Sequence, residues 1–137
     1  MKIYNAFLIL LIAIALSSIP GCKDNTTDTG TNDTFPASKI GYYDYIQPIF
    51  NTYCATIDCH DSYTRSGNLS LASYFDATAR AGIIVKYNSN ASILVQRIEG
   101  KIQPQMPPNR PPLSTNKIQA IKTWINEGAK DTTYVKN

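Results

Sequence analysis

The chain has 137 residues, with 13 Lys and Arg against 10 Asp and Glu and a formal net charge of +3. Hydrophobic residues make up 43% and charged residues 17%, so the chain is neither disordered throughout nor charged enough to indicate a nucleic-acid partner. This length allows one small folded domain, and the charge balance implies no strongly acidic partner.

The first residues are typical of an export signal. Lys2 is followed by an unbroken apolar run from Ala6 to Leu16. A membrane-spanning helix needs about 20 apolar residues, so this shorter run predicts the hydrophobic core of a signal peptide. The sequence that follows, Ile19-Pro20-Gly21-Cys22, resembles the lipobox of bacterial lipoproteins. That resemblance implies a lipoprotein signal peptide over residues 1–21 and lipid attachment at Cys22, and the alternative is a free thiol at Cys22.

The segment from Cys22 onward predicts a tether. Residues 22–38 contain almost no large apolar side chains and are rich in Asn, Asp and Thr. Such a segment cannot bury enough surface to order itself, so we expect an acylated cysteine and a flexible linker here. The domain is then expected at residues 39–131, with a short tail at 132–137. We therefore predict an exported protein, lipid-anchored to a bacterial membrane and facing the periplasm or the cell exterior.

A domain this small often relies on a disulfide, a metal or a cofactor for stability. The candidate is Cys54-Ala55-Thr56-Ile57-Asp58-Cys59-His60, which contains the only histidine of the chain. Two cysteines with a histidine directly after the second are the signature of c-type haem attachment. The two thiols add to the vinyl groups of the porphyrin, and the imidazole reaches the iron from one side. The pattern predicts haem bound through Cys54, Cys59 and His60.

The spacing of the two cysteines is longer than usual. The ordinary haem motif has two residues between them, and this chain has four. On a regular helix, residues five positions apart lie about 140° apart around the axis, so both sulfurs would not face one porphyrin edge. We therefore predict that Ala55 to Asp58 form a loop and that Cys59 and His60 keep the ordinary arrangement.

Three other interpretations of these residues remain open. Cys54 and Cys59 are a possible disulfide pair in an exported protein. The second interpretation is a zinc site formed by Cys54, Cys59 and His60. Structural zinc prefers four ligands, however, and the remaining cysteine lies at the predicted anchor. The third alternative is that His60 is an ordinary surface residue.

Met106 is the candidate for the second axial ligand. It is the only methionine besides Met1, and it lies in a segment, Pro104 to Pro112, in which five of nine residues are prolines. Proline fixes the backbone, so this segment predicts a stiff loop that holds a sulfur in place. The alternative is a methionine that fills a gap in the core. Nearby Arg97, Lys101 and Arg110 are candidates to pair with the haem propionates, or else ordinary solvated charges.

Apolar periodicity predicts a helical frame. Ile46, Ile49, Phe50 and Tyr53 share one helix face that runs into Cys54, with Pro48 near the first turn. A second face, with Ser114 as its N-cap and Gly128 as its stop, is formed by Ile118, Ile121, Trp124 and Ile125. We expect these two helices to pack together over the haem.

Shorter elements are predicted between the two helices. Residues 92–99 predict a third helix with Ile93, Leu94 and Ile98 directed inward. Residues 67–71 predict a turn that enters an extended segment, and residues 73–81 predict one or two helical turns. The fold class predicted from these elements is therefore all-α.

The stretch from about Tyr42 to Ala129 resembles a class I c-type cytochrome, and more narrowly the small planctomycete-type cytochrome c domain. The matching segments are Pro48-Ile49-Phe50, Cys59-His60, Gly67-Asn68-Leu69-Ser70-Leu71, Ser92-Ile93-Leu94, Met106-Pro107-Pro108, Leu113-Ser114 and Trp124-Ile125-Asn126-Glu127-Gly128-Ala129. The resemblance implies a small all-α, cytochrome c-like fold around one covalent haem. It further implies that the haem is attached through Cys54 and Cys59, with His60 as proximal and Met106 as distal ligand.

The function expected from these features is one-electron transfer by a mono-haem cytochrome tethered on the extracytoplasmic side of a membrane. Its partners are then redox proteins, which the sequence does not identify, and the membrane itself through Cys22. Because both axial positions are filled, we expect no catalysis. The alternatives are a haem-based sensor or small-ligand binder in which Met106 is displaced, and an interaction domain without haem that is held by a disulfide.

Overall fold

The structure, a computed structural model, describes residues 33–133. The predicted signal peptide 1–21, the lipid attachment at Cys22, most of the linker and the end of the tail lie outside the described residues. Within 33–133 the regular elements are all helical and no strand is present, which confirms the all-α prediction. The elements are η1 (Tyr42–Ile46), α2 (Gln47–Tyr53), η2 (Ser66–Asn68), α3 (Tyr74–Ala79), η3 (Ser89–Ala91), α4 (Ile93–Ile98) and α5 (Thr115–Asn126).

The predicted first helix is formed by η1 and α2, which follow one another without a break. Ile46, Ile49 and Phe50 are buried as predicted. η1 is a π-helical turn, and Pro48 is the second residue of α2. Proline lacks an N–H and its ring crowds the carbonyl four residues earlier, so a wide turn just before it relieves that contact. The helix ends at Tyr53, directly before the first cysteine of the haem motif.

The predicted last helix is α5. The Ser114 hydroxyl accepts the backbone N–H of Lys117 at 3.4 Å, which confirms the N-cap. At the other end, Gly128 has a φ of +102°, and its N–H donates to the Ile125 carbonyl. Glycine adopts this left-handed conformation without strain, so it stops the helix as predicted.

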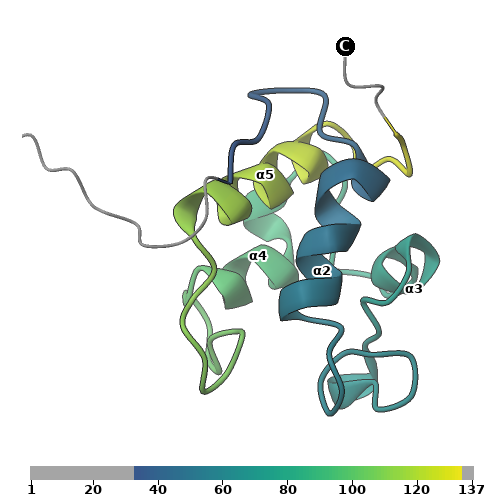
Figure 1. Cartoon of the computed structure of the whole chain (residues 1–137), viewed down its shortest axis with the longest axis vertical. Helices are drawn as coiled ribbons and strands as arrows, with labels where there is room; N and C mark the ends of the chain where they lie inside the picture. The colour runs from purple at the N-terminus through teal and green to yellow at the C-terminus, as the bar shows by residue number, and fades with distance from the viewer. Residues whose placement is uncertain (1–32, 134–137) are drawn as a thin grey trace, which may run out of the picture.

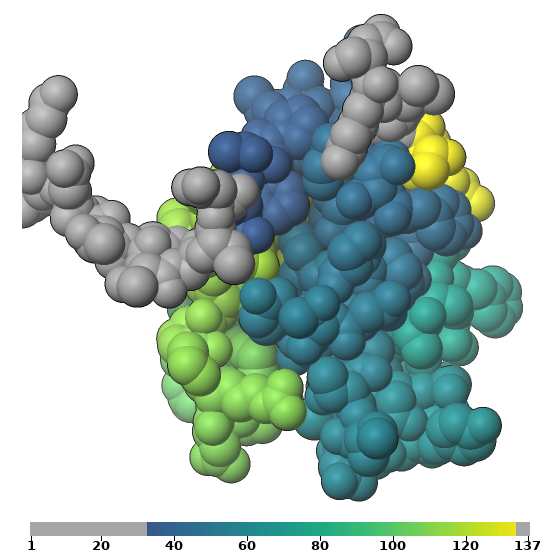
Figure 2. Space-filling model, viewed as in Figure 1, coloured from purple at the N-terminus to yellow at the C-terminus, as the bar shows by residue number. Residues whose placement is uncertain are grey.

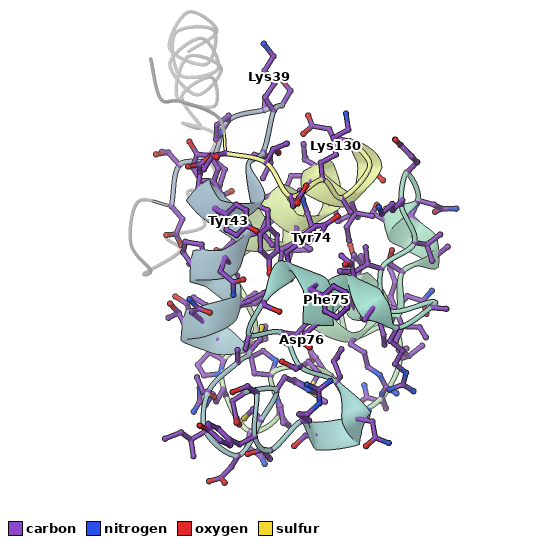
Figure 3. All side chains as sticks on the ribbon, turned by 90° about the vertical axis from the view of Figure 1, so that its right-hand side faces the viewer. Lys39, Tyr43, Tyr74, Phe75, Asp76 and Lys130 are labelled. Carbon is purple, nitrogen blue, oxygen red and sulfur yellow. The ribbon has the colours of Figure 1, made fainter. Side chains whose placement is uncertain are left out.

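α5 packs against η1 on one side and against α4 on another (Figure 1). The Tyr42 side chain is fully buried at this junction, and its ring centroid lies 5.3 Å from that of Trp124 and 5.2 Å from that of Tyr74. Figure 3 labels Tyr74 and also Tyr43, whose ring centroid lies 5.1 Å from that of Tyr42. Buried aromatic contacts of this kind contribute strongly to core stability. The N- and C-terminal helices therefore pack together as predicted.

α4 forms within the predicted residues, but its inward face differs in one residue. Leu94 and Ile98 are buried as predicted, whereas Ile93 is 39% exposed and the prediction for it is wrong. Val95 is fully buried instead. The helix is short, and the face that it turns toward the core carries Leu94, Val95 and Ile98. Ile93 lies on the wall of the cavity described below.

The helical turns predicted at residues 73–81 correspond to α3. The Ser73 hydroxyl accepts the backbone N–H of Asp76 at 3.1 Å and caps the helix. The Asp76 carboxylate in turn accepts hydrogen bonds from the hydroxyls of Ser73 and Ser70. The capping interaction therefore ties α3 to the extended segment before it.

Among the described residues, contacts with the helices are already present at Asp33, ahead of Lys39. The Asp33 carboxylate forms an ion pair with Lys117, and the Phe35 ring packs edge-on against Tyr45 at 5.9 Å. At the far end of the segment, the Glu127 carboxylate accepts the N–H groups of residues 39 and 40 at 2.6 and 3.0 Å. We call residues 33–40 the N-terminal strap. The charged residues that bind the strap are more than 80 positions away in the sequence, so the local composition of the strap does not predict these contacts.

None of the helices in residues 33–133 has the length and hydropathy that crossing a bilayer requires.

Candidate functional site

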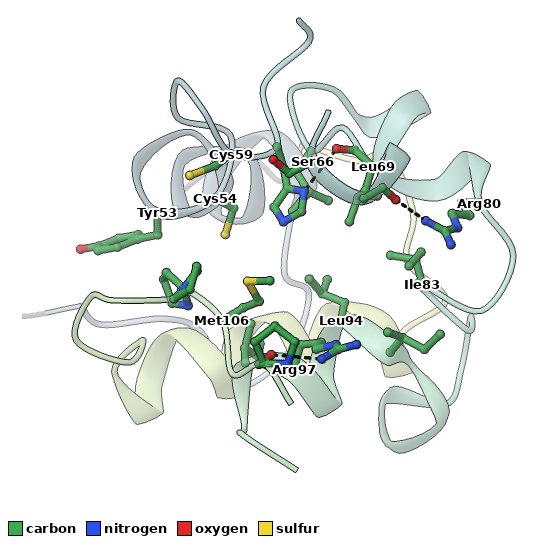
Figure 4. A pocket seen from close by; sticks show the side chains of 18 of the residues that line it. Tyr53, Cys54, Cys59, Ser66, Leu69, Arg80, Ile83, Leu94, Arg97 and Met106 are labelled. Atoms are coloured by element: carbon green, nitrogen blue, oxygen red, sulfur yellow. Dashed lines mark hydrogen bonds between the residues drawn. The ribbon is translucent and has the colours of Figure 1, made fainter. Parts of the chain in front are cut away.

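A cavity of about 400 Å³ lies between two walls of the molecule. One wall comes from the segment that follows α2, and the other comes from α4 and the proline-rich loop after it (Figure 4). In Figure 2 the same two parts, blue to teal and light green, lie on either side of a hollow. The size is within the range of ligand and cofactor sites, and most of the lining is apolar.

The segment between the two cysteines forms a loop, as predicted. The helix stops because the N–H groups of Cys54 and Ala55 both donate to the Phe50 carbonyl. The loop closes where the N–H of His60 donates to the Cys54 carbonyl at 3.1 Å. Ile57 at the tip is 84% exposed, so the extra residues project into solvent. This loop brings the two cysteines, which have four residues between them, to the same cavity.

Cys54 and Cys59 both line the cavity, and both are free thiols. Cys54 is 9% exposed. Its burial, with a smaller effect from neighbouring Cys59, raises the pKa of the Cys54 thiol to about 12. Cys54 therefore presents a neutral thiol to the cavity at physiological pH.

His60 is oriented by a hydrogen bond on its far side. The Nδ1 atom lies 3.2 Å from the backbone oxygen of Leu69, and this bond is drawn in Figure 4. A carbonyl oxygen only accepts, so this contact favours the tautomer of the neutral imidazole that carries its proton on Nδ1 and its lone pair on Nε2. Metal-binding histidines are usually held in this way. His60 also lines the cavity, so its Nε2 atom is suited to bind an iron ion there.

Met106 lies on the opposite wall. Figure 4 shows its thioether across the open space from Cys54 and Leu69. Its backbone N–H donates to the Arg97 carbonyl at 3.0 Å, and the Arg97 guanidinium donates to the Pro104 carbonyl at 3.2 Å. The proline loop is thus fastened to the end of α4. The structure brings Met106 to the same cavity as the cysteines and His60.

Of the three cations predicted near the propionates, only Arg97 lines the cavity. Lys101 forms an ion pair with Glu99 at 2.5 Å, and Arg110 is exposed away from the lining. The lining also includes Arg80, which the sequence did not indicate, and whose guanidinium donates to the Gly67 carbonyl at 2.7 Å. Arg80 follows a short helix with no motif around it, so no local signal marks it.

The donor set of the cavity fits a haem better than a zinc ion. Among residues 33–133, no group of three His, Cys, Asp or Glu side chains is placed to hold a metal ion. The cavity instead combines an apolar lining, a nitrogen lone pair on one wall and a thioether on the other. A porphyrin with iron at its centre requires ligands of this kind from two opposite sides.

Comparison with known proteins gives one family. Residues 57–110 match the family model described as Planctomycete cytochrome C. The match includes Cys59, His60 and Met106 and begins after Cys54. No curated protein and no solved structure matched the chain. Together with the helical fold and the cavity, this match supports a cytochrome c domain of the planctomycete type.

Proposed function

We propose that the chain is a mono-haem c-type cytochrome that carries one electron at a time. Its family indicates haem binding and electron transfer, and the number of haems and the residue roles are our proposal. The observation that carries it is the arrangement of His60 and Met106. The Leu69 carbonyl holds the imidazole on one wall of the cavity, and the Met106 sulfur lies on the other wall.

Each site residue has a separate role in this proposal. Cys54 and Cys59 would attach the haem, each thiol adding across one vinyl group, and His60 Nε2 and the Met106 sulfur would hold its iron as proximal and distal ligands. The bound haem supplies an iron centre that gains and loses one electron. The apolar lining keeps water away from that centre. With His60 and Met106 both holding the iron, the domain would transfer electrons without transforming a substrate.

The fastening of the ligands supports the role of an electron carrier. His60 is held through its ring and its backbone, because its carbonyl accepts the Leu71 N–H at 2.8 Å. Met106 is held by the end of α4 through Arg97. Ligands fixed in this way need not move when the charge on the iron changes, and this favours fast electron transfer.

The proposed location is the extracytoplasmic side of a bacterial membrane. Cytochrome c domains are typically extracytoplasmic. The predicted signal peptide and the lipid at Cys22 would hold the domain at the membrane surface, where redox proteins are its expected partners.

The proposal is tested by visible spectra of the full chain exported in a host that matures c-type cytochromes. We expect a low-spin haem spectrum in both redox states and a methionine-to-iron band in the oxidised state. Ready binding of carbon monoxide by the reduced protein would instead support the sensor, with a displaced Met106. A colourless protein would support an interaction domain without haem.

A further inference from the structure

Lys117 is a buried cation on the first turn of α5. The residue is 7% exposed, and its ammonium forms an ion pair with the Asp33 carboxylate of the N-terminal strap. A buried charge without a partner is strongly destabilising, so this pair fixes where the Lys117 ammonium lies. The position of the cation therefore depends on the strap.

One aromatic ring links the Lys117 ammonium to the proposed haem cavity. Lys117 Nζ lies 5.0 Å from the centroid of the Tyr53 ring. Tyr53 lines the cavity and directly precedes Cys54, and Figure 4 shows the two side by side at one end of the site. A cation over an aromatic face is attracted by it, and more strongly where water is excluded. Lys117 therefore lies against the Tyr53 ring, and that ring is part of the cavity lining.

The strap is held at both ends, so Asp33 has a defined place. Near the start of α5, the Asn116 amide donates to the Asp33 backbone carbonyl at 3.3 Å. Near the end of α5, the Glu127 carboxylate accepts the N–H groups of residues 39 and 40. The Asp33 side chain is 22% exposed, which is much less than the exposure of a surface side chain that moves freely. The ion pair is thus a preorganised part of the domain.

We propose that Lys117 is a positioning residue of the redox site, and that the pair Lys117–Asp33 sets the reduction potential through Tyr53. The inference rests on the proposed function, since it requires a haem in the cavity. It makes the strap, which leads from the predicted membrane anchor, part of the electrostatic environment of the haem.

The two members of the pair act on the potential with opposite sign. Loss of an electron leaves the site one unit more positive, so a nearby cation disfavours the oxidised state and a nearby carboxylate favours it. Neutralising Asp33 leaves the Lys117 charge uncompensated and raises the potential. Removing the Lys117 charge leaves the carboxylate and lowers the potential.

The experiment uses the full chain, matured with haem, and compares redox titrations followed by visible absorbance. At a fixed ambient potential we expect Asp33→Asn to raise the ratio of reduced to oxidised protein by about threefold or more, and Lys117→Met to lower it similarly. Lys117→Arg keeps the charge and should stay close to the wild-type ratio. The double variant with Asp33→Asn and Lys117→Met should have a ratio of reduced to oxidised protein close to that of the wild type.

Matched controls remove one positive and one negative charge at positions outside the Lys117–Asp33 pair. Lys130 and Asp131 are exposed and follow the C-terminal end of α5 (Figure 3 labels Lys130). Lys130→Met and Asp131→Asn should leave the ratio unchanged. Thermal unfolding of each variant separates electrostatics from structure, because a merely structural pair would lower the melting temperature in both single variants without opposite shifts in potential.

Unchanged ratios in both single variants, or shifts in the same direction, would overturn the inference. If Lys117→Met does not fold, Asp33→Asn alone decides, because it leaves the buried lysine in place and must raise the ratio. A wild-type protein without haem would refute the proposed function instead, and it is recognised before any variant is titrated.

Discussion

The Nδ1 atom of His60 and the backbone oxygen of Leu69 lie 3.2 Å apart. Leu69 opens an extended segment just after the turn at Ser66–Asn68, with φ −121° and ψ 128°. That turn aims the carbonyl at the imidazole, and the hydrogen bond leaves Nε2 for the iron. The geometry of a loop nine residues away from the histidine thus prepares the proposed proximal ligand.

Gly67→Ala should weaken this support. Gly67 has a φ of +64°, and an alanine there is disfavoured by roughly 1 kcal/mol although no atom lies within 4 Å of its added Cβ. We expect a lower free energy of unfolding and a perturbed haem spectrum, because Leu69 lies two residues later. Gly82→Ala is the matched control, since its φ is +83° and its Cβ meets only the Ile93 side chain at 3.6 Å. The control should lose comparable stability in denaturant unfolding with an unchanged spectrum.

Met106→Ala should remove the distal ligand and leave the haem attached. The thioether favours the reduced iron, so its loss should lower the potential and abolish the methionine-to-iron band. Visible spectroscopy and a redox titration measure both effects, and a haem-stained denaturing gel checks attachment. An unchanged band would show that another group binds the iron.

Cys54→Ala and Cys59→Ala should each keep one thioether bond. Because both thiols line the cavity, each single variant should still stain for haem on a denaturing gel, with one free vinyl group in the spectrum of its pyridine complex. The double variant should lose the stain. If Cys54→Ala gives the wild-type pyridine spectrum, the longer spacing leaves Cys54 unbonded and Cys59 carries the haem alone.

Stability should fall in acid because of Asp76. Hydrogen bonds from Ser73, and then from Ser70, hold the pKa of the Asp76 carboxyl below its usual value despite partial burial. A depressed pKa in the folded state favours the folded protein above the unfolded value of about 3.9, and this contribution is lost as the pH falls through the folded value. Denaturant unfolding at several pH values below 5 should therefore show a smaller loss for Asp76→Asn than for the wild type. An identical loss in both proteins would assign the acid sensitivity to other groups.

Local patterns were enough to predict the helices and the loop between the cysteines. The buried face of α2, the Ser114 cap and the Gly128 stop each depend on neighbours within a few turns, which the sequence displays directly. The loop at residues 55–58 followed from the angular spacing of two cysteines on a helix. These elements are governed by short-range physics.

Features that depend on distant partners were missed. Asp33 is ordered by Lys117, which is 84 residues away, and neither residue belongs to a motif. Arg80 reaches the cavity because α3 ends beside the Gly67 turn. Apolar periodicity predicts Ile93 in the core, but Ile93 lies on the cavity wall and is 39% exposed. Side chains that face a cofactor share the composition of a core, and periodicity does not distinguish the two.

The most direct test of the central claim is the intact mass of the matured wild-type protein under denaturing conditions. The account predicts the mass of the processed polypeptide plus one haem, retained because the thioether bonds survive unfolding. A mass equal to that of the polypeptide without haem, from a host shown to mature another c-type cytochrome, would contradict it.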